Sequence, residues 1–139
     1  MVQSRPDGRD LSVVDVGSPV RMLIADRNAL VVEAIQDLFA ELDGVMSVLT
    51  AASLPETLAI ARREQPDLIV INACMGIEAD DAVRQVLECS PGSVLFVMAT
   101  NCDDDFERRM RRAGATGAWD KEDMPAGARH ILATVMARR

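Results

Sequence analysis

The sequence predicts an α/β fold in which a five-stranded parallel sheet, of strand order 2-1-3-4-5, carries helices on both faces. Five short apolar runs alternate with five segments of helical spacing along the 139 residues, and this alternation is typical of parallel strands joined by helices. The apolar runs contain little polar alternation, as expected for a sheet that is covered on both faces. Right-handed crossovers leave few other topologies for a chain of this length.

The first half of the chain carries two strands and two helices. The run VRMLIA at residues 20–25 is the first strand, because it is short, apolar and followed by charged residues. Apolar residues then recur every three or four positions over residues 28–42, which predicts a helix ending before a glycine. A second strand covers residues 46–52. Ser53 and Glu56 have the spacing of a capping box and open the second helix.

The second half continues the alternation, with each strand followed by a helix. Pro66 and Asp67 interrupt the second helix, and Pro125 falls in the first turn of the last one, where proline is tolerated. The expected order is that of a flavodoxin-like sheet. The remaining predicted elements are strands at residues 68–72, 93–99 and 117–120, and helices at residues 80–87, 103–112 and after 123.

Length and composition predict one domain without a nucleic-acid-binding surface. Residues 1–18 are rich in Ser, Pro, Gly, Asp and Arg and are expected to form a flexible arm, so that the domain covers residues 19–139. The net charge of −7 argues against direct contact with DNA or RNA, which requires a basic face. Three Phe and one Trp are also too few for a surface on which bases stack.

Nothing in the sequence predicts a membrane segment, an export signal or a metal centre. The apolar runs are far shorter than the ~20 residues that span a bilayer, and the N-terminus has no basic start followed by an apolar stretch. We therefore expect a cytoplasmic protein. Cys74, Cys89 and Cys102 form no C-x-x-C pair, and His130 is the only histidine, so no metal site is expected.

The carboxyl ends of the central strands are the expected place of any functional site, because a parallel α/β sheet presents its ligand or reactive groups at that edge. The residues predicted to meet there are Asp26-Arg27, Asn72, Ala99-Thr100 and Asp120-Lys121.

Four stretches around these strand ends resemble the signature motifs of bacterial response-regulator receivers. They occur in the order and at the separations found in that family, and the resemblance covers residues 20–138. The chain is most similar to the receivers of regulators that carry a LuxR-type helix-turn-helix domain. The four stretches are LIADRNALV, PDLIVINACM, VLFVMAT and AGATGAWDKED.

The resemblance implies an aspartate phospho-acceptor, two further acids that hold Mg²⁺ and a lysine that stabilises the transferring group. In this chain the acceptor position is Asn72, whose amide is uncharged and a poor nucleophile. The acid pair is Asp26-Arg27, so a permanent cation stands where a metal ligand is expected. Only Asp26 and Lys121 are retained, and we expect Arg27 to pair with Asp26 in place of the metal.

Two further positions of the family pattern are altered. The hydroxyl position after the fourth strand aligns with Ala99, with Thr100 directly after it, and the aromatic switch position is Ala118. The pocket is therefore predicted to be degenerate, which argues against ordinary phosphotransfer. Asp26 and Lys121 are interpreted as a relic ion pair that shapes the pocket, and an anion or small ligand held there is the alternative.

These departures predict a non-enzymatic, phosphorylation-independent pseudo-receiver, without a cofactor, that acts by homodimerisation or by binding a protein partner in transcriptional regulation. The resemblance implies a DNA-binding domain that is fused to this chain or associated with it. One alternative is a ligand sensor whose vacated pocket binds a small molecule. Another is a residual phospho-acceptor, with Asp26 receiving the phosphoryl group. A flavin or nucleotide binder is disfavoured, since no glycine-rich turn follows the first strand.

A basic helix and a lone tryptophan form the candidate interface, on an edge where the resemblance implies partner contacts. The alternatives are a solvated helix face for the arginines and core packing for the tryptophan. The residues are Arg108, Arg109, Arg111, Arg112 and Trp119.

Three smaller features also allow two interpretations each. Cys74 and Cys102 follow strands that should be neighbours, so they are either a redox pair or, more commonly in such proteins, ordinary reduced thiols. The acidic run 103–105 is interpreted as charge favoured at a helix N-terminus rather than as a metal site. His130 is expected on a helix surface.

Overall fold

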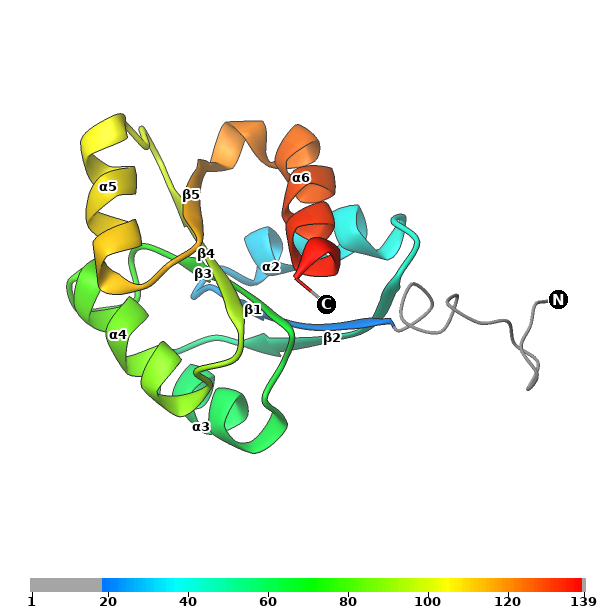
Figure 1. Cartoon of the computed structure of the whole chain (residues 1–139), viewed down its shortest axis with the longest axis horizontal. Coiled ribbons are helices and arrows are strands. Elements are labelled where there is room, and N and C mark those ends of the chain that lie inside the picture. Colours follow the sequence, from blue (N-terminus) through cyan, green and yellow to red (C-terminus); the bar gives the residue numbers. More distant parts are fainter. Residues whose placement is uncertain (1–18, 139) are drawn as a thin grey trace, which may run out of the picture.

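The computed structural model describes residues 19–138 and confirms the predicted fold. All five strands are parallel and lie in the order β2-β1-β3-β4-β5 (Figure 1). The arm predicted over residues 1–18 lies outside the described residues. The strands are β1 (Val20–Ala25), β2 (Val45–Ala51), β3 (Leu68–Asn72), β4 (Val94–Ala99) and β5 (Gly117–Asp120).

Helices cover both faces of the sheet, as predicted. Three of them pack side by side on one face, in the order α3, α4, α5, and α2 and α6 pack together on the other (Figure 1). A 3-10 turn at Lys121–Asp123, which the sequence did not predict, separates β5 from α6. Across residues 19–138, none of the helices has the length and apolar character that a bilayer crossing requires. The helices are α2 (Ala29–Ala40), α3 (Leu54–Glu64), α4 (Ala79–Cys89), α5 (Asp104–Ala113) and α6 (Met124–Ala137).

The sheet separates two hydrophobic clusters. The central strands β3 and β4 are buried along their whole length, and successive side chains point to opposite faces. Burial of each large apolar side chain stabilises the fold by ~1.5–3 kcal/mol, so both faces hold the sheet in place. The cluster beneath α3, α4 and α5 includes Leu23, Ile69, Leu95 and Met110. The cluster beneath α2 and α6 includes Met22, Phe39, Val70 and Ile131.

Three helices begin at residues whose side chains cap the backbone. Asn28, Ser53 and Asp103 each accept a hydrogen bond from a backbone N–H of the first turn, an interaction that stabilises a helix by ~1 kcal/mol. The predicted capping box is present in a modified form. Glu56 reaches back to the N–H of Ala52, at 2.7 Å, instead of to that of the capping residue.

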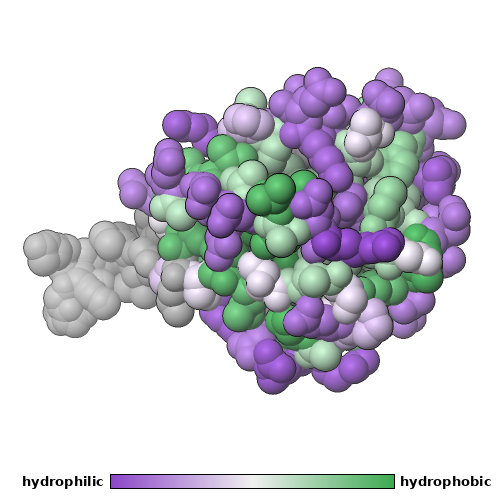
Figure 2. All heavy atoms as spheres, turned by 180° about the vertical axis from the view of Figure 1, so that it is seen from behind, coloured by the Kyte–Doolittle hydropathy of each residue, from purple (hydrophilic) through white to green (hydrophobic). Residues whose placement is uncertain are grey.

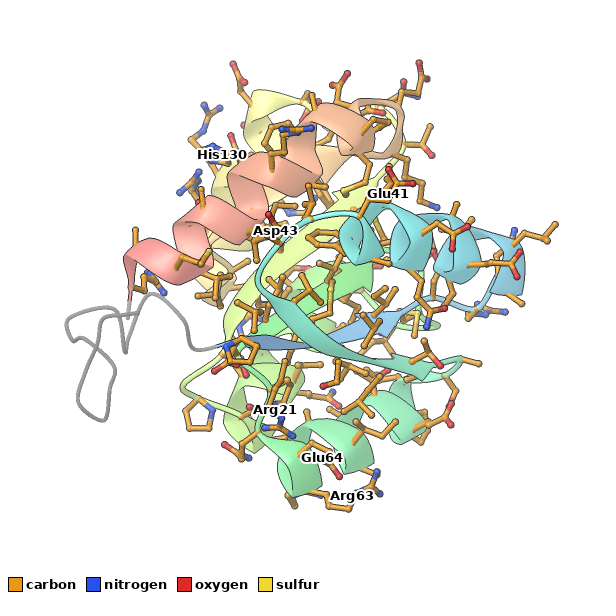
Figure 3. The ribbon with its side chains drawn as sticks, turned by 90° about the vertical axis from the view of Figure 1, so that its right-hand side faces the viewer. Arg21, Glu41, Asp43, Arg63, Glu64 and His130 are labelled. Carbon is orange, nitrogen blue, oxygen red and sulfur yellow. The ribbon has the colours of Figure 1, made fainter. Side chains whose placement is uncertain are left out.

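Arg21 ties the amino end of β1 to the end of α3 (Figure 3). Its guanidinium donates to the carbonyl oxygen and to Oε1 of Glu64, at 2.8 and 3.0 Å, and its backbone N–H donates to Asp67 at 2.9 Å. A hydrogen bond from Arg63, together with the charges of Arg63 and Arg21, holds the pKa of Glu64 below its ordinary value. This charged cluster lies at the amino ends of the strands, away from the edge predicted to hold the site.

α6 approaches the sheet closely because Gly127 has no side chain. A Cβ atom at this position would lie 2.9 Å from the ring of Trp119, so the helix backbone packs directly on the indole. The ring of His130 contacts the same indole, with 5.6 Å between ring centroids. Trp119 is half-buried against the cluster beneath α2 and α6. Core packing was one of the two interpretations of this tryptophan that the sequence allowed.

Gly127→Val is expected to lower the free energy of unfolding by about 2 kcal/mol, because its added methyl groups collide with a rigid ring. Gly92→Val is the matched control, since a Cβ atom there meets nothing within 4 Å. Urea unfolding followed by fluorescence of the single tryptophan measures both variants. Equal midpoints for the two variants contradict the close packing of α6.

Candidate functional site

The carboxyl ends of three strands place four of the predicted site residues around one cavity. Asp26 and Arg27 follow β1, Asn72 ends β3, and Lys121 follows β5. These residues line a shallow cavity of 580 Å³ that is widely open to solvent, and Asn28, Ala29 and Cys74 complete its wall. A second cavity of 230 Å³ shares Asp26 and Arg27 and extends toward β2 and α3. The two cavities therefore meet at the end of β1.

Asp26 is a buried carboxylate, with only 1% of its surface exposed. Its backbone N–H donates to the carbonyl oxygen of Ala51 at 3.0 Å, which extends the β1–β2 ladder. Oδ1 accepts a hydrogen bond from the N–H of Asn28 at 2.8 Å, just before α2 begins. Oδ2 is buried and has no hydrogen-bond partner among the described residues. One oxygen of this carboxylate is thus used to build the fold, and the other is not.

The ion pairs predicted for Asp26 are not formed. The ion pairs of residues 19–138 lie elsewhere, and neither Arg27 nor Lys121 takes part in one. Arg27 is exposed on the turn between β1 and α2, where its guanidinium keeps its hydration. Pairing with a buried carboxylate requires the loss of that hydration, and this cost can exceed the Coulombic gain. The expected replacement of a metal by Arg27, and the relic pair with Lys121, are therefore wrong for this structure.

The side chain of Asn72 hydrogen-bonds to the backbone of the loop that follows it. The residue is 8% exposed, and its Oδ1 accepts a hydrogen bond from the N–H of Cys74 at 3.3 Å. The next residue, Ala73, donates its N–H to the carbonyl oxygen of Met98 at 2.8 Å and so joins this loop to β4. The amide oxygen at the predicted acceptor position is therefore engaged in backbone structure.

Curated relatives of the chain are response regulators. "Response regulator GacA" of Pseudomonas viridiflava is 35% identical over 104 residues, which make up 73% of this chain and 48% of that protein. "Response regulator GacA" of Pseudomonas aeruginosa is 30% identical over 120 residues, or 82% of this chain and 56% of that protein. The matched region is a response-regulator receiver domain. No family model matches the chain.

The receiver spans about half the length of the curated relatives it matches. Two solved structures illustrate its fold. A two-component response regulator of the LuxR family from Aurantimonas sp. SI85-9A1 has a TM-score of 0.79 at 23% identity, over 88% of each chain. A CheY-like receiver domain protein from Methanospirillum hungatei JF-1 has a TM-score of 0.76 at 18% identity, over 87% of this chain and 96% of that one. At these identities the likeness shows the fold alone.

The donor set of the receiver's cavity does not fit the Mg²⁺ ion that the family resemblance implies. Mg²⁺ requires a near-octahedral set of oxygen ligands. Asp26 is the one carboxylate that lines the larger cavity, while Arg27 and Lys121 bring two positive charges to the same wall. The side-chain oxygen of Asn72 already accepts a backbone N–H. Within residues 19–138, no three His, Cys, Asp or Glu side chains are placed to hold a metal ion.

The altered switch positions lie outside the cavity wall. Ala99 ends β4, is buried, and pairs with Asp120 of β5. Thr100 follows it in an exposed turn, and Ala118 is buried in the cluster beneath α3, α4 and α5. None of these three residues lines the larger cavity. The hydroxyl group of Thr100 therefore does not reach it, and the two alanines have neither a hydroxyl group nor a ring.

The structure does not bring the candidate interface residues together. Trp119 packs toward α6, whereas the arginines lie on α5, and three of them already form ion pairs with acids. The hydrogen bond from Arg109 is the main reason that the pKa of Asp80 lies below its ordinary value. Exposed ion pairs of this kind contribute ~0–1 kcal/mol each to stability, so they add little to the stability of the fold. The pairs are Arg108–Asp105 at 2.7 Å, Arg109–Asp80 at 3.2 Å and Arg111–Glu107 at 3.3 Å.

The acidic run and His130 follow the simpler interpretations. All three cysteines are free thiols in this structure, and burial is the main cause that raises the pKa of the Cys102 thiol. The acidic run begins with Asp103, which caps α5, and continues into the acidic first turn of that helix. His130 is exposed on α6, as predicted.

Three polar residues of the two cavity walls were not identified as site residues from the sequence. Asn28 both caps α2 and donates its N–H to Asp26, and its position just before an apolar periodic segment was the available signal. Thr50 and Glu56 line the smaller cavity from β2 and α3. Glu56 was recognised only as a capping residue, and no local pattern connects either residue with the end of β1.

Asp26→Asn is expected to raise the free energy of unfolding by ~1–3 kcal/mol, because it removes the charge from a buried oxygen that lacks a donor. The amide oxygen still accepts the N–H of Asn28. Asp81→Asn, at an exposed position, is the control and should change stability by less than ~0.5 kcal/mol. Urea unfolding at pH 7 measures both, and a destabilised Asp26→Asn variant contradicts the assignment of Oδ2 as unpartnered.

Proposed function

We propose that this chain is a non-enzymatic receiver that signals without phosphorylation, by binding a second copy of itself, in transcriptional regulation. The observation that carries the proposal is the cavity at the end of β1, where Arg27 and Asn72 replace two of the acids that phosphotransfer needs. An amide oxygen that accepts a backbone N–H is neither a nucleophile nor a metal ligand of sufficient charge. Two cations and one buried carboxylate also disfavour a bound Mg²⁺ ion.

The names of similar proteins support the regulatory part of the proposal. The curated relatives are response regulators, and one solved structure of the same fold is a LuxR-family response regulator. Because the chain spans about half of those relatives, we propose that a DNA-binding domain, fused or associated, or another protein partner, carries the output. In this proposal the receiver itself contributes the surface that binds the second copy.

Light scattering of the purified chain, with and without beryllofluoride and Mg²⁺, tests independence from phosphorylation. The expected result is a mass of two copies that does not change with either addition. Labelling by acetyl phosphate with Mg²⁺ should also remain at background, because no carboxylate nucleophile is present at Asn72. A dimer that forms only with beryllofluoride and Mg²⁺ overturns the proposal.

The face formed by α2 and α6 supports the choice of a second copy as partner. An apolar groove of 270 Å³ runs between the two helices and is bordered by one charged residue, Lys121. Leu30, at the start of α2, is 75% exposed. The view from behind Figure 1 shows apolar surface among hydrophilic side chains (Figure 2). The groove lining is Val31, Ala34, Ile35, Leu38, Met98, Lys121, Met124 and Pro125.

Charged residues also flank this α2/α6 groove. Exposed acids lie on α2 and the turn after it, and Arg129 is exposed on α6; Figure 3 shows Glu41 and Asp43 near the end of α2 and His130 on α6. The acids Glu122 and Asp123 are exposed just before α6. A two-fold axis through the groove allows the acids along α2 of one copy to face Arg129 of the other. The acids of α2 and the turn after it are Glu33, Asp37, Glu41 and Asp43.

Leu30→Glu is expected to weaken the dimer by about tenfold or more, because it places a charge where ~1.5–3 kcal/mol of apolar burial is lost. Ile77→Glu is the matched control, since Ile77 is also an exposed large apolar residue, at 40%, but lies after β3 on another part of the surface. Sedimentation over a concentration series measures both dissociation constants. Equal effects of the two variants rule out the α2/α6 groove as the interface.

A second candidate function is ligand sensing, in which the vacated cavity binds a small molecule. The observation that favours it is Oδ2 of Asp26, a buried carboxylate oxygen without a donor among the described residues, in a side chain that lines both cavities. Leaving such an oxygen unpaired costs free energy. A ligand that supplies the missing donor recovers that cost and stabilises the conformation to which it binds.

A further inference from the structure

We propose that the two cavities at the end of β1 together bind an α-amino acid, with its ammonium group on Asp26 and its carboxylate on Arg27 and Lys121. The inference deepens the ligand-sensing candidate by naming a ligand class, and it does not depend on the dimer. It uses the free oxygen of Asp26, the two cations that line the wall and the smaller cavity that adjoins them.

The unpartnered Oδ2 atom of Asp26 favours a ligand with a positively charged hydrogen-bond donor. Asp26 is 1% exposed, and burial of a carboxylate costs free energy unless hydrogen-bond donors or cations surround it. The N–H of Asn28 supplies one donor, to Oδ1, and Oδ2 remains for another. Within residues 19–138, no three His, Cys, Asp or Glu side chains are placed to hold a divalent metal ion. A primary ammonium group carries one positive charge, which one carboxylate balances, and one of its three N–H donors can bind Oδ2.

The two cations of the wall select an anionic group on the same ligand. Arg27 and Lys121 border the larger cavity with Asp26, and no ion pair within residues 19–138 includes either of them. A guanidinium group presents a fork of N–H donors that matches a carboxylate. A ligand with an ammonium group alone would make no contact with these cations, and an anion alone would make none with Asp26. A zwitterion satisfies both.

The smaller cavity fits the side chain of the ligand. Its 230 Å³ adjoin Asp26 and Arg27, so a group attached to the carbon between ammonium and carboxylate can enter it. Four of its lining residues are apolar and two are polar, which favours a short side chain that is aliphatic or carries a hydroxyl group. The lining beyond Asp26 and Arg27 is Ala29, Val32, Ala51, Ala52, Thr50 and Glu56.

Binding requires a side chain to move. Oδ2 of Asp26 is shielded from solvent, so an ammonium group reaches it only after a neighbouring side chain has been displaced. Arg27 and Lys121 are suited to this movement, because both are long and neither is held by an ion pair in the described part of the chain. The ligand would then draw both cations onto its carboxylate.

Titration calorimetry of the full chain with L-serine and L-valine tests the proposal. Ethylamine, propionate, inorganic phosphate and Mg²⁺ serve as probes that carry charge of one sign only. At least one of the two amino acids is expected to bind at least tenfold more tightly than every one of these probes. Binding of ethylamine, propionate or phosphate that is as tight as that of the amino acids overturns the ligand class. Binding of Mg²⁺ alone, or of nothing in the panel, overturns it as well.

Variants connect the binding to the named groups. Asp26→Asn and Arg27→Gln should each weaken amino-acid binding at least tenfold, while Arg84→Gln, an exposed arginine on α4, should leave it unchanged. Urea unfolding of each variant separates loss of binding from loss of fold. If all three variants bind alike, the amino acid does not occupy this cavity. Light scattering of the same samples reports the dimer separately, so failure of one proposal is distinguishable from failure of the other.

Discussion

The pairing of β1 with both β2 and β3 is the constraint on which the whole site depends. Ala25, the last residue of β1, lies beside Ala51 and Ile71, so Asp26 leaves the strand in a position that is already enclosed. Its N–H continues the ladder to β2, and its Oδ1 receives the N–H that precedes α2. The same strand end therefore buries the carboxylate, sets the start of a helix and forms the junction of the two cavities.

The proposal that this receiver does not transfer phosphate depends on the charge balance of the larger cavity. Phosphotransfer needs clustered carboxylates, because a hard divalent cation and a transferring phosphoryl group must share the site with the nucleophile. Here one carboxylate lines the larger cavity, with two cations and an amide whose oxygen is used by the backbone. This charge balance is the reason for proposing an organic zwitterion as the ligand in preference to a metal ion.

Lys121 connects the cavity with the α2/α6 groove, since it lines both. It also begins the 3-10 turn that leads into α6. A ligand carboxylate that attracts this lysine would withdraw its charge from an otherwise apolar groove, and the apolar groove is the surface proposed for the second copy. The two proposals can thus be linked through one side chain, and such a link amounts to allostery only if the ligand changes the affinity of the dimer.

The sequence by itself determined the strands, their order and the strand ends at which the site lies. Hydrophobic periodicity and helix capping are local patterns, so they can be identified in the sequence. The carboxyl ends of parallel strands lie at one edge of the sheet, and Asp26, Asn72 and Lys121 could therefore be placed together from the sequence alone. Only the tertiary structure decided how these groups meet. Arg27 leaves Asp26 unpaired because hydration of an exposed cation competes with pairing to a buried carboxylate, and Trp119 turns toward α6 because Gly127 leaves room for its ring. Side-chain solvation and close packing depend on neighbours that are distant in the chain, which is why no local pattern could predict them.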